Sequence, residues 1–239
     1  MKEPRIPEGV DPKDLDPQVR QELRSLSRDN ADMVAKHLIM AATLLDENTE
    51  KALEHARAAK DRAGRVAVAR ETNGIAAYHA GEWKEAISEL RAARRMQGGP
   101  GLIAVLADAE RALGRPEKAL GVAGEYRPEE LDPETRVELA MVVAGAYQDL
   151  DRYEEAIVAL EEELDAADAP DVTKLRVTYA YADALARAGR TADAIQWFTK
   201  ANELDTEEVL DAEKRIAELN EGTGESNGND AGAESSEEK

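Results

Sequence analysis

The chain contains no cysteine. This absence excludes disulfide bonds and thiolate metal sites, and it is consistent with a reducing cytoplasm. Aromatic residues are also scarce, with one Phe, two Trp and six Tyr in 239 residues. The core must therefore consist mainly of alanine and leucine, which suits closely packed helices that meet through small side chains.

The sequence has no apolar run long enough to cross a bilayer. The longest, residues 33–45, includes Lys36 and His37 and is shorter than the roughly 20 apolar residues of a spanning helix. The N-terminal residues MKEPRIPEGVDPKDLDP are charged and rich in proline, and they lack the apolar segment of a secretory signal. We therefore expect a soluble, cytoplasmic protein.

Catalytic and cofactor-binding motifs are missing from the sequence as well. It has no glycine-rich phosphate loop, no nucleophile elbow and no paired acid–base residues. His37, His55 and His79 lack carboxylates at metal-ligand spacing, so we expect them to be packing or surface residues. The sequence predicts no enzymatic activity, no cofactor and no metal site.

Negative charge dominates but is unevenly distributed. The formal net charge is −20, from 51 Asp and Glu against 31 Lys and Arg. Residues 51–100 hold ten basic and six acidic residues, whereas residues 201–239 hold three basic and thirteen acidic ones. Such an asymmetry can reflect a binding surface.

What the chain does contain is an internal repeat. Five alanines occupy the same point of a recurring pattern and are 34, 33, 37 and 38 residues apart: Ala52, Ala86, Ala119, Ala156 and Ala194. Apolar residues recur at three and four positions around them, which indicates amphipathic helices. A period near 34 residues predicts stacked helix–turn–helix units.

Small residues and turn glycines fall at fixed places in this repeat. Gly74 and Ala86 take two positions of the second copy where antiparallel helices must approach closely. Gly81, Gly114 and Gly189 follow the first helix of their copies, where the turn requires a positive φ. We therefore expect each copy to be a tight helical hairpin.

Two segments, NGIAAYHAGEWKEAISELRAA (73–93) and YADALARAGRTADAIQWFTKA (181–201), resemble the tetratricopeptide repeat (TPR) family. The resemblance covers roughly residues 33–208 and implies an all-α, right-handed helical-repeat solenoid of about five TPR-like helix–turn–helix units. Asp151 replaces the turn glycine of the fourth copy. The excess of arginine over lysine, 20 against 11, is similar to that of bacterial TPR proteins.

Segments outside the repeats define the remaining organisation. We expect an extended N-terminal arm over residues 1–15 and a flanking helix over 16–32 that packs on the first repeat. A polar-faced capping helix is predicted over 207–219, with Val209, Leu210, Ile216 and Leu219 facing inward. Residues 220–239 have almost no apolar side chain and are predicted to be a disordered acidic tail.

The family resemblance also implies a binding surface, because TPR ligands usually lie in a concave groove formed by the first helix of each repeat. The corresponding positions form a polar wall with two tyrosines, suited to an extended peptide or a partner helix. The alternative is that they are solvated surface positions without a ligand. They are Glu71, Thr72, Tyr78, His79, Asp108, Arg111, Met141, Gln148, Arg176, Tyr179, Asp183 and Arg187.

A basic ridge is the second candidate surface. Arg57 and Arg91 occupy the same position in neighbouring copies, so stacking should bring them side by side. The whole ridge consists of Arg57, Arg62, Arg91, Arg94 and Arg95. It could bind a phosphate backbone or an acidic protein surface. Alternatively, its charges are paired at helical spacing by Glu54, Asp61, Glu85 and Glu89.

These observations leave two functional hypotheses. The first is an adaptor or scaffold that holds a peptide or helix of another protein in the groove. The second is an RNA- or ribosome-associated protein that uses the basic ridge, although a net charge of −20 disfavours contact with polyanions elsewhere. The identity of the partner, and whether the chain self-associates, stay open.

Overall fold

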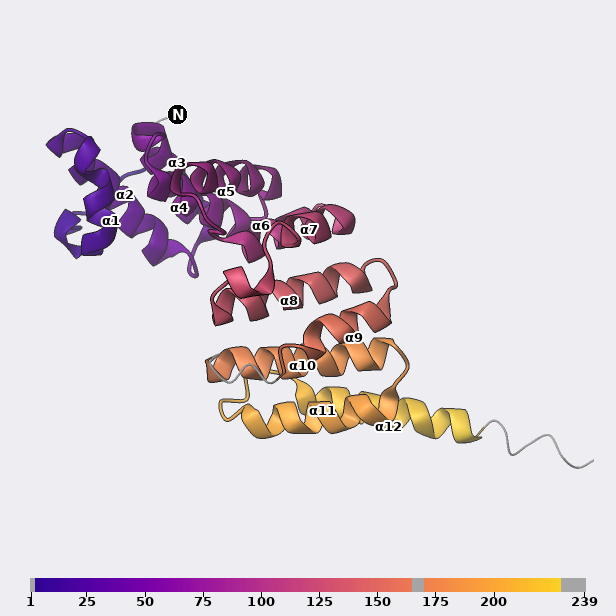
Figure 1. Cartoon of the computed structure of the whole chain (residues 1–239). Helices are drawn as coiled ribbons and strands as arrows, with labels where there is room; N and C mark the ends of the chain where they lie inside the picture. Colours follow the sequence, from indigo (N-terminus) through magenta and orange to yellow (C-terminus); the bar gives the residue numbers. More distant parts are fainter. Residues whose placement is uncertain (1–2, 165–169, 229–239) are drawn as a thin grey trace, which may run out of the picture. The chain divides into compact units, whose positions relative to one another are not determined.

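The structure, a computed structural model, describes residues 3–164 and 170–228. Within these ranges the chain forms helices joined by turns, without a β-strand (Figure 1). The predicted all-α helical-repeat architecture is confirmed. The chain divides into two compact units, Met1–Arg127 and Pro128–Lys239, here called unit 1 and unit 2.

Unit 1 contains three successive helical hairpins preceded by a short flanking segment. Each hairpin packs on the next through its second helix, as α3 does on α4 and α5 does on α6. The hairpins are α2 (Arg28–Leu44) with α3 (Thr49–Ala63), α4 (Ala67–His79) with α5 (Trp83–Gln97), and α6 (Ile103–Ala112) with α7 (Pro116–Ala123).

Unit 2 contains two hairpins and a final helix. After a 3-10 turn at Pro128–Glu130, the first hairpin packs on the second, and the final helix packs on α11. The elements are α8 (Pro133–Gln148) with α9 (Tyr153–Glu161), α10 (Asp171–Arg187) with α11 (Thr191–Leu204), and α12 (Ala212–Gly228).

The small residues of the repeat form the seams between helices, as predicted. Ala86, Ala156 and Ala194 are completely buried. The approach of α4 to α5 is so close that a Cβ added to Gly74 would lie 2.6 Å from Leu90 Cγ. Larger side chains at these positions would separate the helices.

Four of the five turns between paired helices contain a residue in the left-handed backbone conformation, and the α2–α3 turn is the exception. The φ angles of Gly81, Gly114 and Gly189 are 75°, 69° and 77°. Asp151, which replaces the glycine in the fourth copy, keeps a positive φ of 57°, and its carboxylate accepts a hydrogen bond from the Tyr153 hydroxyl at 2.7 Å. Because aspartate tolerates this conformation better than most residues do, the substitution leaves the turn intact.

The N-terminal segment differs from the expected arm and helix. A 3-10 helix, Pro12–Asp14, lies within the predicted arm, and the flanking helix is reduced to α1 (Pro17–Glu22) and the 3-10 turn Leu23–Ser25. The first repeat helix, α2, already begins at Arg28 rather than near residue 33. Asp16 caps α1, and the buried Leu23 packs in the core of the first hairpin.

The C-terminal helix is also displaced from its predicted bounds. It starts at Ala212, five residues later than expected, and it continues to Gly228, past residue 220, where the acidic tail was predicted to begin. Residues 229–239 lie outside the described residues. Val209 precedes the helix and is 69% exposed rather than inward-facing, whereas Ile216 and Leu219 pack on the core of unit 2.

No helix in the described part of the chain has both the length and the apolar character of a membrane span.

Candidate interaction surfaces

In unit 1, the predicted groove residues lie along α4 and α6. The Tyr78 hydroxyl donates a hydrogen bond to the Asp108 carboxylate, which links the two helices. Asp108 also accepts a hydrogen bond from Arg111 Nη1 at 3.0 Å. The Tyr78 ring packs edge-on against Trp83, with centroids 5.2 Å apart. The structure thus brings together three of the predicted groove residues in one network on the first-helix face of unit 1.

The other predicted residues of α4 are less closely linked to this network. His79 is exposed, and its ring lies edge-on to Tyr78, 5.8 Å between centroids. Thr72 is half-buried. Burial raises the pKa of Glu71, while a hydrogen bond with Gln97 opposes that rise. Glu71 is therefore a half-buried acid at the edge of the surface rather than a freely solvated one.

In unit 2, the predicted groove residues lie on α8 and α10, the first helices of its two hairpins. Arg176 on α10 pairs with Glu138 on α8, and this ion pair connects the two first helices. Met141 is half-buried against the core cluster of unit 2, and Gln148 is half-buried near the end of α8. The α8 residues therefore contribute less exposed polar surface than the sequence suggested.

The remaining α10 residues face the final helix. The Tyr179 hydroxyl donates a hydrogen bond to Asp211, just before α12. Burial and this hydrogen bond raise the pKa of Tyr179. Asp183 accepts hydrogen bonds from Arg215 Nη2 at 3.1 Å and from Arg187 Nε at 2.7 Å. The start of α12 therefore already occupies part of the surface that the sequence assigned to a ligand.

Asp211 and Arg215 were missed as members of this surface. Their four-residue spacing matches that of Tyr179 and Asp183 on α10, so each pair lies on one side of its helical segment. This complementary spacing was a usable signal. The signal was overlooked because the predicted capping helix, residues 207–219, was expected to contact the last repeat through its apolar residues.

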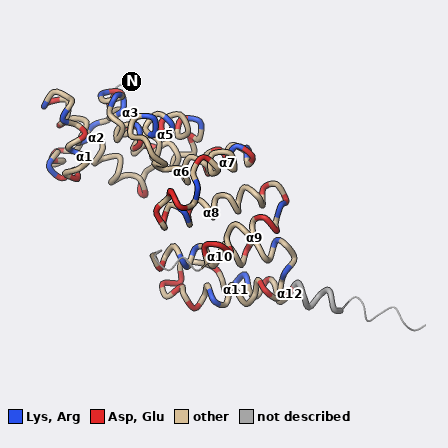
Figure 2. The backbone as a smooth tube through the Cα atoms, viewed as in Figure 1, with Lys and Arg blue, Asp and Glu red and all other residues tan. Residues whose placement is uncertain are grey.

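The arginines of the basic ridge are mostly paired with carboxylates. Lys and Arg positions recur along α3 and α5 (Figure 2). Arg57 Nη2 lies 2.5 Å from Glu85 Oε2, and Arg91 Nη2 lies 2.9 Å from the buried Glu110. Arg62 donates to Glu3 at 2.8 Å and also bonds to Asn30, while Arg94 pairs with Glu125.

Only part of the expected pairing is observed. Glu85 does neutralise Arg57, but Glu89 pairs with Arg70 instead of a ridge arginine. The ion pairs of the four bonded ridge arginines run between different segments rather than along one helix. Because most ridge charges are engaged, the structure does not favour the nucleic-acid hypothesis, which requires cations available to phosphates.

Two of the three histidines form a buried pair in the first hairpin. His37 Nδ1 and His55 Nδ1 lie 2.9 Å apart, and both side chains are buried. Burial lowers the pKa of His37 to about 4 and also lowers that of His55. Among the residues that the structure describes, no three His, Cys, Asp or Glu side chains are arranged to hold a metal ion.

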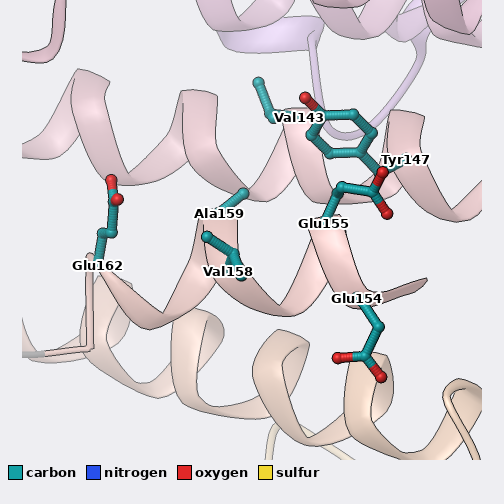
Figure 3. Close-up of a pocket in the computed structure, with 7 residues that line it drawn as sticks. All are labelled: Val143, Tyr147, Glu154, Glu155, Val158, Ala159 and Glu162. Atoms are coloured by element: carbon teal, nitrogen blue, oxygen red, sulfur yellow. The ribbon is translucent and has the colours of Figure 1, made fainter. Parts of the chain in front are cut away.

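Unit 2 also has an open depression between α8 and α9 that the sequence did not reveal. Its volume is about 400 Å³, and it combines apolar side chains with three glutamates (Figure 3). The lining residues are Val143, Tyr147, Glu154, Glu155, Val158, Ala159 and Glu162. None of these residues was among the predicted site residues.

No protein-family model matches the chain, and the curated proteins searched include no significant match. Solved structures do match. A Podosopora anserina protein described as a kinesin light chain with nearly identical TPR-like repeats superimposes with a TM-score of 0.61. The two sequences are 16% identical, and the match covers 75% of this chain and 97% of that one.

A thermophilic TPR protein from Thermus thermophilus gives a TM-score of 0.60 at 20% identity. The match covers 78% of this chain and 98% of that protein. At such low identities, the shared feature is the fold. The helical hairpins described above are those of a tetratricopeptide-repeat fold.

Proposed function

We propose that this chain, which has the tetratricopeptide-repeat fold, is a non-enzymatic adaptor that binds a peptide or helix of a partner protein. Binding occurs on the first-helix faces of its repeats. The main support is the network of Tyr78, Asp108 and Arg111, which presents an aromatic ring, a carboxylate and a guanidinium together on unit 1. Such groups are typical of the residues that dominate protein interfaces.

The geometry of the network supports recognition of a polar backbone or side chain. Contacts with Trp83 and Asp108 hold the Tyr78 ring in place, so little side-chain entropy is lost when a partner binds. Asp108 and Arg111 lie in a partly exposed position and offer an acceptor and donors. A peptide that contacts them gains directional hydrogen bonds at a preorganised site.

Unit 2 contributes a smaller surface of the same type. Arg176 and Glu138 are exposed or half-buried on adjacent first helices, and Arg187 is exposed at the end of α10. Since α12 covers Tyr179 and Asp183, the free part of this surface is limited to the remaining residues. We therefore assign the stronger share of partner binding to unit 1.

The test is capture of the partner from the native cell by the full chain and by the variant Tyr78→Phe/Arg111→Ala. The variant removes one hydroxyl and one guanidinium while leaving the ring against Trp83. Losing hydrogen bonds that involve charged groups costs about 1–3 kcal/mol, so affinity for a captured partner should fall by roughly tenfold or more.

Tyr126→Phe/Arg24→Ala is the matched control, because it makes the same chemical changes elsewhere in unit 1. The Tyr126 hydroxyl bonds only to the Gly99 carbonyl among its described contacts, and Arg24 is exposed and belongs to neither candidate surface. Circular dichroism should show unchanged helicity in both variants. Equal retention of the partner by the wild type and by Tyr78→Phe/Arg111→Ala would contradict the assignment.

A further inference from the structure

The depression between α8 and α9 has an apolar floor that is open to solvent. Val143 and the Tyr147 ring come from α8, and Val158 and Ala159 come from α9 (Figure 3). Val158 is 55% exposed, which places it among the few large apolar side chains with high exposure in the described chain. Covering this floor would remove apolar surface from water and so favours association with a partner.

Carboxylates border this floor at both ends. Figure 3 shows Val158 and Ala159 between Glu162 on one side and Glu154 and Glu155 on the other. Glu154 lies in the first turn of α9 and Glu162 directly follows its last residue, so the two are eight residues apart, which corresponds to about 12 Å along a helix. Neither Glu154 nor Glu162 makes a close ion pair within the described parts of the chain, although Glu154 interacts electrostatically with Arg190, whose close partner is Asp193.

The negative charge around the depression is concentrated locally. Residues 149–164 contain seven acidic side chains and one basic side chain, Arg152. Glu163 is neutralised by Arg136, but it is nearly buried and lies outside the depression. The border therefore keeps an excess of exposed carboxylates that attracts cationic groups.

Arg152 shows that the carboxylates and the aromatic ring of the depression can bind a guanidinium group. Its guanidinium carbon lies 4.7 Å from the centroid of the Tyr147 ring, and its Nη2 lies 2.8 Å from Glu155 Oε1. The chain's own arginine is thus held by a carboxylate and an aromatic face at one end of the depression. Glu162, at the other end, has the same acceptor chemistry but pairs with no cation of the described residues.

We propose that the α8–α9 depression is a second docking site, which binds a basic amphipathic helix of a partner protein. The partner's apolar side chain covers Val158 and Ala159, and Lys or Arg residues about two helical turns apart contact the carboxylates at the two ends. This site goes beyond the proposed adaptor function because it uses a different face and specifies the charge of the partner.

The probe is a fluorescent, alanine-rich helical peptide of roughly 20 residues, long enough to hold a helix. It carries leucines at i and i+4, with lysines at flanking positions seven residues apart. A matched peptide has glutamate in place of each lysine. Binding to the full chain is measured by fluorescence anisotropy at low ionic strength and again at high salt, which screens exposed charges.

The lysine peptide should bind and the glutamate peptide should not. Glu154→Gln/Glu162→Gln should weaken binding about fivefold, because it removes charge at both ends of the site. Val158→Ser should weaken it by a similar factor through loss of apolar contact, and folding should be unaffected because the side chain is exposed. Tyr78→Phe/Arg111→Ala should leave this binding unchanged, which separates the site from the proposed first-helix surface.

Glu203→Gln/Glu207→Gln is the control for general attraction to an acidic protein. It makes the same charge change at exposed positions outside the depression. If this control weakens binding as much as Glu154→Gln/Glu162→Gln, the attraction is nonspecific and the proposal is wrong. It also fails if the lysine peptide does not bind, or if Val158 instead mediates self-association that the peptide does not displace.

Discussion

At the scale of single residues, close packing between helices depends on positions with almost no side chain. Gly74 illustrates the requirement, because a Cβ added there would collide with the Leu90 side chain and would lie 3.2 Å from the backbone nitrogen of Leu90. The backbone atom cannot move independently of α5. The same principle explains why Ala86, Ala156 and Ala194 are fully buried at the equivalent seams.

Gly74→Ala should therefore destabilise unit 1 although alanine favours helix formation. The collision with Leu90 forces repacking, and overpacking of this type costs about 1–3 kcal/mol. Urea denaturation monitored by circular dichroism measures the change. Gly121→Ala is the control, since its Cβ would meet nothing within 4 Å. It should be neutral or stabilising by up to about 1 kcal/mol. Equal effects would argue against a tight α4–α5 seam.

The buried histidine pair makes the stability of the first hairpin depend on pH. Unfolded histidine titrates near 6.5, whereas burial, with a smaller effect of His55, lowers the pKa of His37 to about 4. Glu3 partly opposes this shift, and Arg62 adds to it. Between the two pKa values the unfolded state binds more protons than the folded state. The contribution of neutral, buried His37 to the free energy of unfolding is thus fully present above about pH 6.5 and is lost as the pH falls toward 4.

The expected loss for His37 is roughly 3 kcal/mol over that range. Unfolding free energies measured from pH 7 to pH 4.5 should fall steeply for the wild type. The decline should be shallower for His37→Leu/His55→Leu, because this variant has no imidazole to protonate at either position. His79→Gln serves as the control because His79 is exposed and far along the chain from the pair. A decline of unchanged steepness in the double variant would exclude the histidines as its cause.

At the scale of secondary-structure elements, α12 completes the packing of α10 and α11. Arg215 connects it to both helices: the guanidinium lies 5.7 Å from the centroid of the Phe198 ring, and it bonds to Asp183 and Glu218. Phe198 itself is completely buried. The helix thus covers a core residue that the last hairpin alone would leave next to solvent.

Arg215→Ala should lower the stability of unit 2 by about 1 kcal/mol, through lost ion pairs and lost packing of the aliphatic stem. In a Trp83→Phe background, denaturation followed by Trp197 fluorescence reports on this unit directly. The neighbouring variant Lys214→Ala removes an exposed cation whose contact with Glu218, at 3.8 Å, is long for an ion pair. It should change stability by less than about 0.5 kcal/mol. Indistinguishable midpoints for the two variants would show that Arg215 is not a packing residue.

At the scale of the whole molecule, each compact unit has its own hydrophobic core. One cluster of buried residues joins the N-terminal flank to the first hairpins of unit 1. Another extends from Val137 to Ala212 within unit 2. Because repeat proteins are stabilised by contacts between neighbours, stability need not be uniform along the chain.

We expect the two units to unfold at different urea concentrations. Trp83 lies in unit 1 and Trp197 in unit 2, so Trp197→Phe and Trp83→Phe variants each leave one reporter. Adding Gly74→Ala should shift the transition reported by Trp83 while leaving that reported by Trp197 unchanged. Coincident midpoints that shift together would instead indicate a single cooperative transition.

Periodicity alone was sufficient to predict the helical hairpins, because the constraint repeats with every copy. A buried alanine, a turn glycine and apolar residues at helical spacing recur locally, so Ala86, Gly81 and their equivalents could be placed without coordinates. The positions of Tyr78, Asp108 and Arg111 on first helices followed from the same frame. Their hydrogen-bonded network did not, since it depends on how far α6 lies from α4.

Contacts between residues far apart in sequence were decided only by packing. Arg62 bonds to Glu3 and Arg91 to Glu110, across 59 and 19 residues, whereas helical spacing suggested nearer partners. The extent of α12 and the open floor at Val158 likewise depend on which surfaces neighbouring helices cover. Local spacing therefore determines which side of a helix a residue occupies. The approach of other helices determines whether that side is paired, buried or left available to a partner.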